Sequence, residues 1–165
     1  MLRPKKDIIG RCGYKCGLCL AYRENIKSDA DRKRFRDGLL KYYRYRLSLQ
    51  DCYCDGCLAD DRKNPTLLTP NCRVRPCVVK RRLDNCASCD RYPCRTLEKK
   101  FIDGKQVVKK YDAPIPKKDY DRFVGPYENK KRLDAIRKKL KGGPDLRRRE
   151  RTSRSVSGTS KVRST

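Results

Sequence analysis

The chain has 165 residues, of which 36% are hydrophobic and 39% charged, and its formal net charge is +25. This composition excludes a large apolar core, and so polar a chain usually needs a disulfide, a metal or a partner to hold its fold. The eleven cysteines are the candidates for that role, and histidine is absent.

The N-terminal half predicts a cysteine loop followed by one amphipathic helix. Residues 1–7 form a basic lead-in, and a turn-rich loop with three cysteines follows. Ser28 and Asp31 have the spacing of a helix-capping pair. The next apolar and aromatic residues recur at helical spacing: Phe35, Leu39, Tyr42 and Tyr43. We therefore expect a helix over about 29–49, which Gly38 weakens slightly.

The middle of the chain, residues 52–94, is interrupted by four prolines and predicts loops with short secondary structure. One or two helical turns are expected around Val78, Val79 and Leu83. A second short helix is expected over 95–102, where Leu97 and Phe101 share a face.

The C-terminal part divides into three predicted segments. Residues 103–127 contain Ala113-Pro-Ile-Pro116 and predict an extended segment that wraps the surface. Residues 128–141 carry an apolar stripe and predict a helix that ends at Gly142-Gly143-Pro144. The Arg-, Ser- and Thr-rich tail after it is expected to be disordered. We thus expect a cysteine-rich domain over 1–102, a wrap and helix over 103–141, and a basic tail over 142–165.

The cysteines fall into four clusters whose spacing is typical of metal ligation. The clusters are Cys12-x3-Cys16-x2-Cys19, Cys52-x-Cys54-x2-Cys57, Cys72-x4-Cys77 and Cys86-x2-Cys89-x4-Cys94. A C-x2-C pair lets two sulfurs converge on one ion from a tight turn, and two such pairs complete a tetrahedral four-thiolate site. Three C-x2-C pairs in a chain without histidine predict metal binding through thiolates.

The pairing of the clusters is open. One closed site of consecutive cysteines is our preferred arrangement: Cys54, Cys57, Cys72 and Cys77. The other six ligand candidates would then form a four-thiolate site with two spare thiols, or a two-metal site with bridging sulfurs. Swapped arrangements, such as Cys16/Cys19 with Cys86/Cys89, satisfy the same spacing.

Thiolate ligands select zinc or iron–sulfur over hard cations. Zinc in a closed four-cysteine site is structural, and it can contribute about 10–16 kcal/mol of apparent folding free energy. Iron–sulfur clusters use the same ligands, but the spacings here differ from the usual ferredoxin runs. Zn²⁺ is therefore the expected metal, and an iron–sulfur cluster is the alternative.

The motifs together resemble a family of small prokaryotic cysteine-rich proteins, known as a domain of unknown function and presumed to bind zinc. The resemblance covers about residues 8–102, in the order CGxxCxxCxAY, CDGC, CxxxxC and CxxCxxYPC. It implies ten metal ligands: Cys12, Cys16, Cys19, Cys54, Cys57, Cys72, Cys77, Cys86, Cys89 and Cys94. Cys52 looks like an addition to the family pattern, and the family brings no reaction with it.

The sequence favours a reducing cellular compartment. No apolar run of signal-peptide length follows the N-terminus, and an odd number of cysteines would leave one thiol outside any set of disulfides. No stretch has the length and apolarity of a membrane span. We therefore expect a cytoplasmic protein whose thiols bind metal.

Conventional catalysis is not expected. The chain lacks histidine, the commonest general base, and contains no glycine-rich phosphate loop. We predict no catalytic residues and expect a binding or interaction module. The iron–sulfur alternative would instead act in electron transfer, cofactor maturation or redox sensing.

The positive charge predicts attraction to polyanions, which include RNA, DNA and acidic proteins. Cations and aromatic residues alternate in 41–46, an arrangement that can stack bases and neutralise phosphates. The interpretation that we favour for this stretch is that the tyrosines face the core while the cations are solvated. The candidate nucleic-acid contacts are Lys41, Tyr43, Arg44, Arg46, Arg81 and Arg82.

Overall fold

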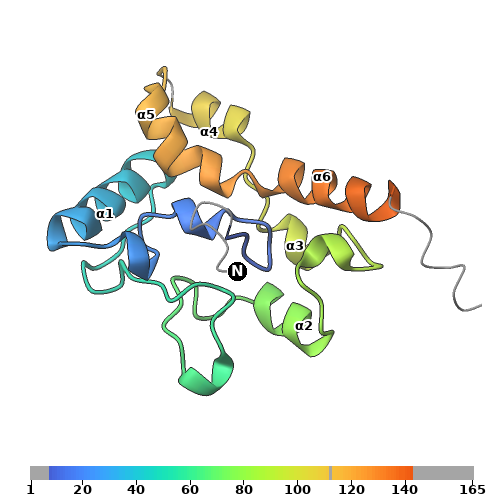
Figure 1. The fold of residues 1–165 in the computed structure, drawn as a ribbon. Coiled ribbons are helices and arrows are strands. Elements are labelled where there is room, and N and C mark those ends of the chain that lie inside the picture. The colour runs from blue at the N-terminus through green and yellow to red at the C-terminus, as the bar shows by residue number, and fades with distance from the viewer. Residues whose placement is uncertain (1–7, 112, 143–165) are drawn as a thin grey trace, which may run out of the picture.

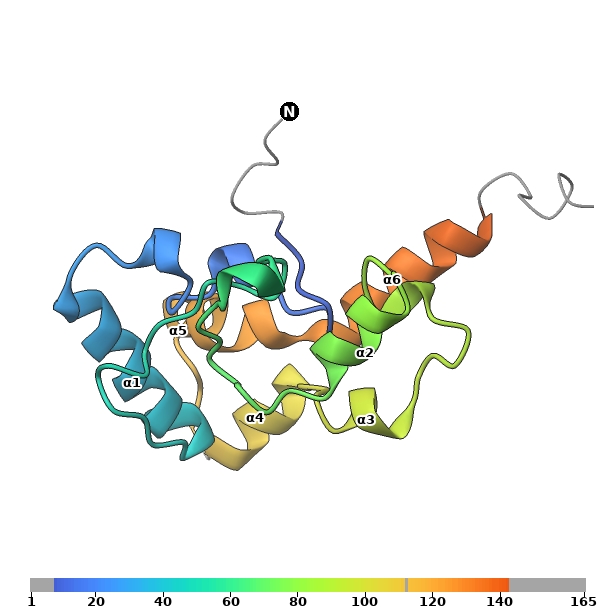
Figure 2. The same ribbon diagram turned by 90° about the horizontal axis from the view of Figure 1, so that it is seen from below.

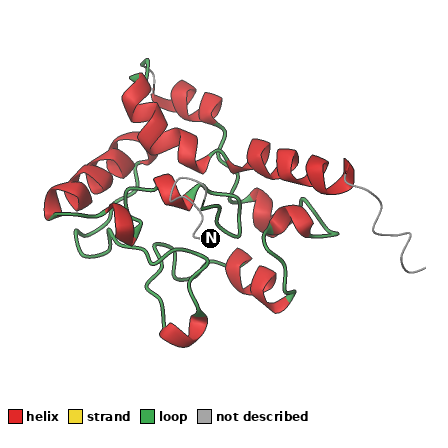
Figure 3. Ribbon diagram, in the orientation of Figure 1, coloured by secondary structure: helices red, strands yellow, loops and turns green. Residues whose placement is uncertain are grey.

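The computed structural model describes residues 8–111 and 113–142 and shows helices joined by irregular segments (Figures 1 and 3). No strand occurs within these two ranges, where Tyr22 and Cys54 form an isolated parallel bridge. The helices are α1 (Asp29–Tyr43), α2 (Val74–Lys80), α3 (Arg95–Glu98), α4 (Gly104–Tyr111), α5 (Lys117–Asp119) and α6 (Asn129–Gly142). The predicted small, mainly α and irregular fold is confirmed, whereas its dependence on metal stays a prediction.

Helix α1 starts where the sequence predicts and ends six residues earlier than expected. At its start, the carboxylate of Asp31 accepts a hydrogen bond from the backbone N–H of Ser28 at 3.1 Å, as in a capping box. At its end, Arg44 adopts a left-handed conformation with φ 55°. The prediction of a helix to residue 49 is wrong because neither glycine nor proline marks this stop in the sequence.

The segment expected to be extended is largely helical, so that prediction is also wrong. Helix α4 starts after Asp103, whose carboxylate accepts the backbone N–H of Lys105 at 2.9 Å. The prolines at 114 and 116 lie between α4 and α5 instead of marking one long extended run. A π-helical turn, Tyr120–Val124, and a 3₁₀ turn, Gly125–Tyr127, then lead into α6.

The cysteine-rich middle of the chain contains little regular structure, as predicted. Helices α2 and α3 are short, and 3₁₀ turns occur at Cys16–Leu18, Arg23–Asn25, Asp61–Lys63 and Cys86–Ser88. Long loops connect these pieces (Figure 3). Their positions therefore depend on side-chain contacts more than on backbone ladders.

The core is divided into small clusters instead of one large interior. One cluster joins α2, α3 and α6 around Val78, Leu97 and Leu133. Another surrounds Phe35 of α1, and a third joins α1, α4 and the π-helical turn around Phe123. Helices α1 and α6 lie at opposite ends of the molecule, with the N-terminal cysteine loop between them (Figures 1 and 2).

The C-terminal helix contacts the cysteine loops directly. Leu133 is fully buried, and it packs where a Cβ on Gly13 would lie. Arg137 donates through Nη1 to the carbonyl oxygens of Ala87 at 2.9 Å and Cys89 at 2.6 Å. Residues beyond the predicted cysteine-rich domain thus hold its loops in place.

The two ends of the chain lie outside the described residues. These are the predicted basic lead-in at 1–7 and the predicted tail of 142–165 except Gly142, which is the last residue of α6. Among the helices of the described part, none combines the length and the apolar character needed to cross a bilayer.

Candidate metal centre

The ten ligand candidates gather around two cavities. The first, here called the six-cysteine chamber, has a volume of about 100 Å³. Its cysteines are Cys12, Cys16, Cys19, Cys54, Cys57 and Cys72. The second, the four-cysteine chamber, has a volume of about 240 Å³. Its cysteines are Cys77, Cys86, Cys89 and Cys94.

This division differs from the preferred sequence pairing. Cys72 and Cys77 were expected to complete one site with Cys54 and Cys57, but they line different cavities. The reason is local: Cys72 precedes α2, whereas Cys77 lies within this helix. The swapped pairing of Cys16/Cys19 with Cys86/Cys89 would likewise have to join cysteines that line different chambers.

Two of the C-x2-C pairs fold into the same turn. Each follows the pattern Cys-x-x-Cys-x-x-Tyr, and its first three residues form a 3₁₀ turn. In the first, the N–H of Cys19 donates to the carbonyl of Cys16 at 3.0 Å, and Tyr22 donates to Cys19 at 3.0 Å. The corresponding bonds from Cys89 and Tyr92 measure 3.1 and 3.3 Å. The two segments with this shared sequence pattern therefore also share a structure, and one of them lies at each chamber.

The third pair depends on glycine for its turn. Gly56 has φ 89°, a conformation that residues with a Cβ rarely adopt. Its N–H points at the Cys54 sulfur at 3.3 Å, and a Cβ at this position would lie 3.0 Å from the ring of Tyr22. A backbone N–H directed at sulfur stabilises a thiolate, so this turn presents Cys54 as a ligand.

The thiols of the six-cysteine chamber are mostly shielded from water. Burial raises the pKa of Cys12 to about 12, and burial likewise raises the pKa of Cys19. A hydrogen bond from the Cys16 thiol lowers the pKa of Cys57 to about 7, helped by the charge of Arg75. Packing is tight here, because a Cβ on Gly10 would lie 2.7 Å from the Cys16 sulfur.

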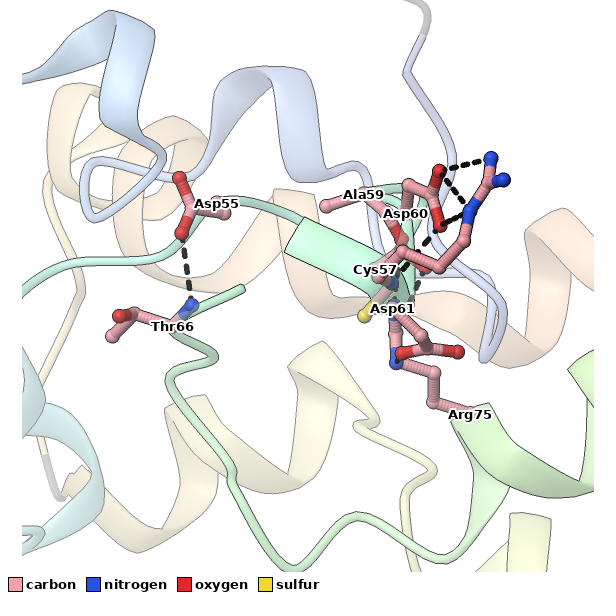
Figure 4. A network of polar contacts seen from close by, with 8 residues as sticks. Asp55, Cys57, Ala59, Asp60, Asp61, Thr66 and Arg75 are labelled. Atoms are coloured by element: carbon pink, nitrogen blue, oxygen red, sulfur yellow. Dashed lines mark hydrogen bonds and ion pairs between the residues drawn. The ribbon is translucent and has the colours of Figure 1, made fainter. Parts of the chain in front are cut away.

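Arg75 places a buried cation beside the six-cysteine chamber (Figure 4). Its side chain is 8% exposed and donates to the carbonyl oxygens of Cys57 at 3.2 Å and Ala59 at 2.6 Å. It also forms an ion pair with Asp61. Figure 4 shows these contacts together with the bond from Thr66 N–H to Asp55 at 2.8 Å, which closes the same loop.

The four-cysteine chamber also has cations in its wall. Arg81 Nη1 lies 3.7 Å from the sulfur of Cys89 and 3.2 Å from a carboxylate oxygen of Asp90. Arg73 and Arg91 line the same cavity. Burial raises the pKa of the Cys86 thiol to about 12, with the charges of neighbouring cysteines adding to the effect. A zinc ion with four thiolates carries a net charge of −2, which these guanidinium groups would offset.

The donor chemistry of both chambers fits a thiophilic metal. Every candidate ligand is a free cysteine, and thiolates select zinc or iron–sulfur. Among the described residues, no group of three or more Cys, Asp or Glu side chains is already arranged around a metal position. Ligation would therefore require cysteine side chains to rotate inward between staggered rotamers.

Cys52 lies apart from the chambers. It is fully buried against α1, and its thiol donates to the carbonyl oxygen of Ser48 at 3.2 Å. These contacts give Cys52 a packing role and make it a useful control for the ligand candidates.

The candidate nucleic-acid residues have different environments. Tyr43 is half-buried and donates its hydroxyl hydrogen to the carbonyl of Phe123 at 2.7 Å, so its polar end is engaged within the fold. Lys41 lies over the rings of Tyr42 and Tyr111 at 5.0 and 5.5 Å. Arg81 contacts a cysteine, as described above. The remaining candidates are exposed: Arg44, Arg46 and Arg82.

Several residues of the site were not predicted. Tyr127 is buried, and its hydroxyl lies 3.2 Å from the sulfur of Cys19. Asn129 is fully buried and bonds the carbonyl of Cys12. An aromatic residue or an asparagine outside the cysteine motifs carries no sequence signal for these roles. Arg75 likewise could not be distinguished by sequence from the other members of the 45 Lys and Arg residues.

Comparison with known proteins identifies a family and nothing more specific. A family model described as "Protein of unknown function (DUF3795)" matches residues 8–99. No curated protein and no solved structure matches the chain. The matched region contains all ten cysteines of the two chambers, while α4, α5 and α6 lie beyond it.

Proposed function

The chain belongs to the family described as "Protein of unknown function (DUF3795)", and we propose that it is a zinc-binding interaction module. The observation that carries the proposal is the four-cysteine chamber. Its ligands would come from α2, from the turn at Cys86–Ser88 and from the residue that precedes α3. Four thiolates make a closed, structural zinc site without an open position for a substrate.

Zinc at this chamber would join α2, the turn at Cys86–Ser88 and α3 through their cysteine side chains. Helix α2, α3 and the intervening loop share one small apolar cluster with Leu133 of α6. A closed zinc site can contribute about 10–16 kcal/mol of apparent folding free energy, more than so small a cluster is expected to supply. This energetic role agrees with a polar chain whose core is divided.

Metal analysis of paired serine variants tests this proposal. We expect the anaerobically purified protein to be colourless and to contain zinc, and we expect Cys86→Ser to lose the zinc ion of the four-cysteine chamber and to unfold at a lower denaturant concentration. The control is Cys52→Ser, which keeps a donor to Ser48 outside the chambers and should retain its zinc. Equal zinc content in Cys86→Ser and the parent protein would refute the four-cysteine site.

The binding partner we propose is single-stranded nucleic acid. A cleft of about 380 Å³ between α1 and α4 is lined by Lys41, Arg44 and Lys110 together with the half-buried ring of Tyr111. Cations beside a half-buried aromatic ring suit phosphates and a stacked base. The net charge of +25 would attract such a ligand over a distance.

Salt-dependent binding assays test this partner. We expect RNA or DNA oligonucleotides to bind with an affinity that falls as salt rises, and the double variant Arg44→Gln/Lys110→Gln to bind more weakly with a smaller salt slope. Lys138→Gln/Lys139→Gln removes the same charge from exposed positions of α6 and is the control. Equal losses in both variants would indicate diffuse attraction, and binding of acidic proteins alone would indicate a protein partner.

A further inference from the structure

The six-cysteine chamber contains more thiols than one tetrahedral ion can use. A single zinc ion takes four thiolates, which would leave two buried cysteines without a role at the cavity. Two tetrahedral ions need eight ligand positions, and six thiolates fill eight positions when two of them bridge both ions. We propose that this chamber binds two zinc ions through six thiolates, two of which are shared. The inference rests on the proposed zinc function and extends it to a three-zinc protein.

The positions of the thiols suggest which two are shared. A Cβ on Gly10 would lie 2.7 Å from the Cys16 sulfur and 3.6 Å from the Cβ of Cys57, so these two side chains lie side by side. They come from different C-x2-C pairs, which are joined where Tyr22 and Cys54 form their backbone bridge. Cys16 and Cys57 are therefore the bridging ligands in this arrangement.

The remaining four thiols complete the coordination of the two ions, with two thiols for each ion. Cys19 and Cys54 belong to the same two turns as the bridging cysteines, so both C-x2-C pairs converge on the first ion. Cys12 comes from the N-terminal loop and Cys72 from the residues just before α2, and these two complete the second ion. Cys12 lies at the boundary between the cavity and the apolar cluster that contains Cys86.

Space and charge agree with two ions. About 10–15 Å³ of such a cavity holds one water molecule, so about 100 Å³ accommodates a pair of ions in place of solvent. On binding, two Zn²⁺ ions replace the protons of six thiols, and the centre carries a net charge of −2. Arg75 and Lys100 line the chamber and offset this charge.

Tyrosines close the chamber from the side of the C-terminal segment. The Tyr127 hydroxyl lies 3.2 Å from the Cys19 sulfur, a distance that suits donation to a ligating thiolate. Tyr14 packs edge-on against Tyr127 with ring centroids 5.4 Å apart, and its hydroxyl donates to the carbonyl of Lys100 at 2.9 Å. These rings exclude water from the proposed centre.

Native mass spectrometry of the full chain, expressed with added zinc and purified anaerobically, counts the ions. We expect three zinc ions per chain. Cys72→Ser should retain two, because it removes a ligand of the second ion only, and Cys86→Ser should also retain two. Cys52→Ser is the matched control and should keep three.

Substitution with ¹¹³Cd separates the proposed arrangement from its rivals without a variant that must fold. Three resonances, two of them split by coupling through a shared sulfur, are expected for the parent protein. Two uncoupled resonances and two zinc ions per chain would overturn the bridged centre while leaving the four-cysteine site intact. Iron and sulfide with a brown colour would also overturn it. Absence of bound zinc altogether would instead refute the underlying zinc proposal.

Discussion

Asn129 donates a hydrogen bond from Nδ2 to the carbonyl oxygen of Cys12 at 2.8 Å, across 117 positions of the sequence. Its Oδ1 accepts the backbone N–H of Ile102 at 3.2 Å, and the side chain is fully buried. One amide thus joins the first cysteine loop, the segment after α3 and the start of α6. The region that matches the family therefore depends on residues that follow it.

Asn129→Ala is expected to lower the free energy of unfolding strongly. The substitution leaves the buried carbonyl of Cys12 and the partly buried N–H of Ile102 without this partner, and a buried polar group that loses its partner costs about 1–3 kcal/mol. Urea unfolding of the zinc-loaded protein measures this effect. Lys130→Ala changes the adjacent exposed residue and should shift stability far less. Similar unfolding midpoints for the two variants would contradict the anchoring role.

Gly38→Ala is expected to destabilise the protein, although alanine favours helices by about 1 kcal/mol over glycine. A Cβ at Gly38 would overlap the ring of Phe123, which is buried between α1 and α4. Displacing this ring should cost about 1–3 kcal/mol and so outweigh the helix propensity.

Gly142→Ala is the control for that prediction, because nothing lies within 4 Å of a Cβ at this helical position. Thermal unfolding should show a lower midpoint for Gly38→Ala and an unchanged or higher midpoint for Gly142→Ala. A stabilised Gly38→Ala variant would show that α1 and the π-helical turn are not packed as described.

Arg75→Met should weaken metal retention at the six-cysteine chamber. It removes a buried cation that donates to the carbonyls of Cys57 and Ala59, so the turn loses its support and the proposed centre loses a compensating charge. Residues that support ligands in this way typically change metal affinity by about 10–100-fold.

Competition with a zinc chelator measures the affinity change for Arg75→Met. Arg62→Met removes an arginine from the same loop region, but its side chain is 90% exposed and its partner is Asp60. We expect no change for this control. If both variants release zinc like the parent protein, Arg75 has no part in metal retention.

The start of α1 provides a test that depends on pH. The hydrogen bond from the backbone N–H of Lys27 lowers the pKa of Asp31 below its usual value. The bond from Ser28 and the charge of Arg34 add to this effect, and desolvation opposes it. A carboxylate with a lowered pKa contributes stability above its unfolded-state pKa and loses that contribution as the pH falls through the folded-state value.

Titration of the Asp31 carboxyl by NMR should therefore give a midpoint below 3.8, the usual pKa of an aspartate. Asp31→Asn should lower the free energy of unfolding at neutral pH. The difference in this free energy between the variant and the parent protein should become smaller in acid. A normal midpoint for Asp31 would mean that the capping bonds do not form.

The sequence predicts local features of this fold better than their assembly. The start of α1 follows from Ser28 and Asp31, and the C-x2-C turns follow from their spacing, because the interactions involved are only a few residues apart. The end of α1 and the helical turns within 104–127 could not be predicted, because they depend on contacts between distant segments. One such contact is the hydrogen bond from the Tyr43 hydroxyl to the carbonyl of Phe123.

The same distinction applies to the site. The ten cysteines could be identified as candidate ligands from spacing and resemblance. Their division could not, because it depends on α2, which starts between Cys72 and Cys77 and presents them to different cavities. Tyr127 and Asn129 reach the chambers through tertiary contacts over more than one hundred positions. No local pattern marks such partners.

The central claim is that metal bound by the two chambers holds the fold together. The most direct measurement is an amide ¹H–¹⁵N NMR spectrum of the zinc-loaded protein, recorded as a strong chelator is added under reducing conditions. We predict that the dispersed signals collapse as zinc is removed and return when zinc is restored. A chelated, zinc-free protein that keeps its dispersed spectrum would contradict the claim.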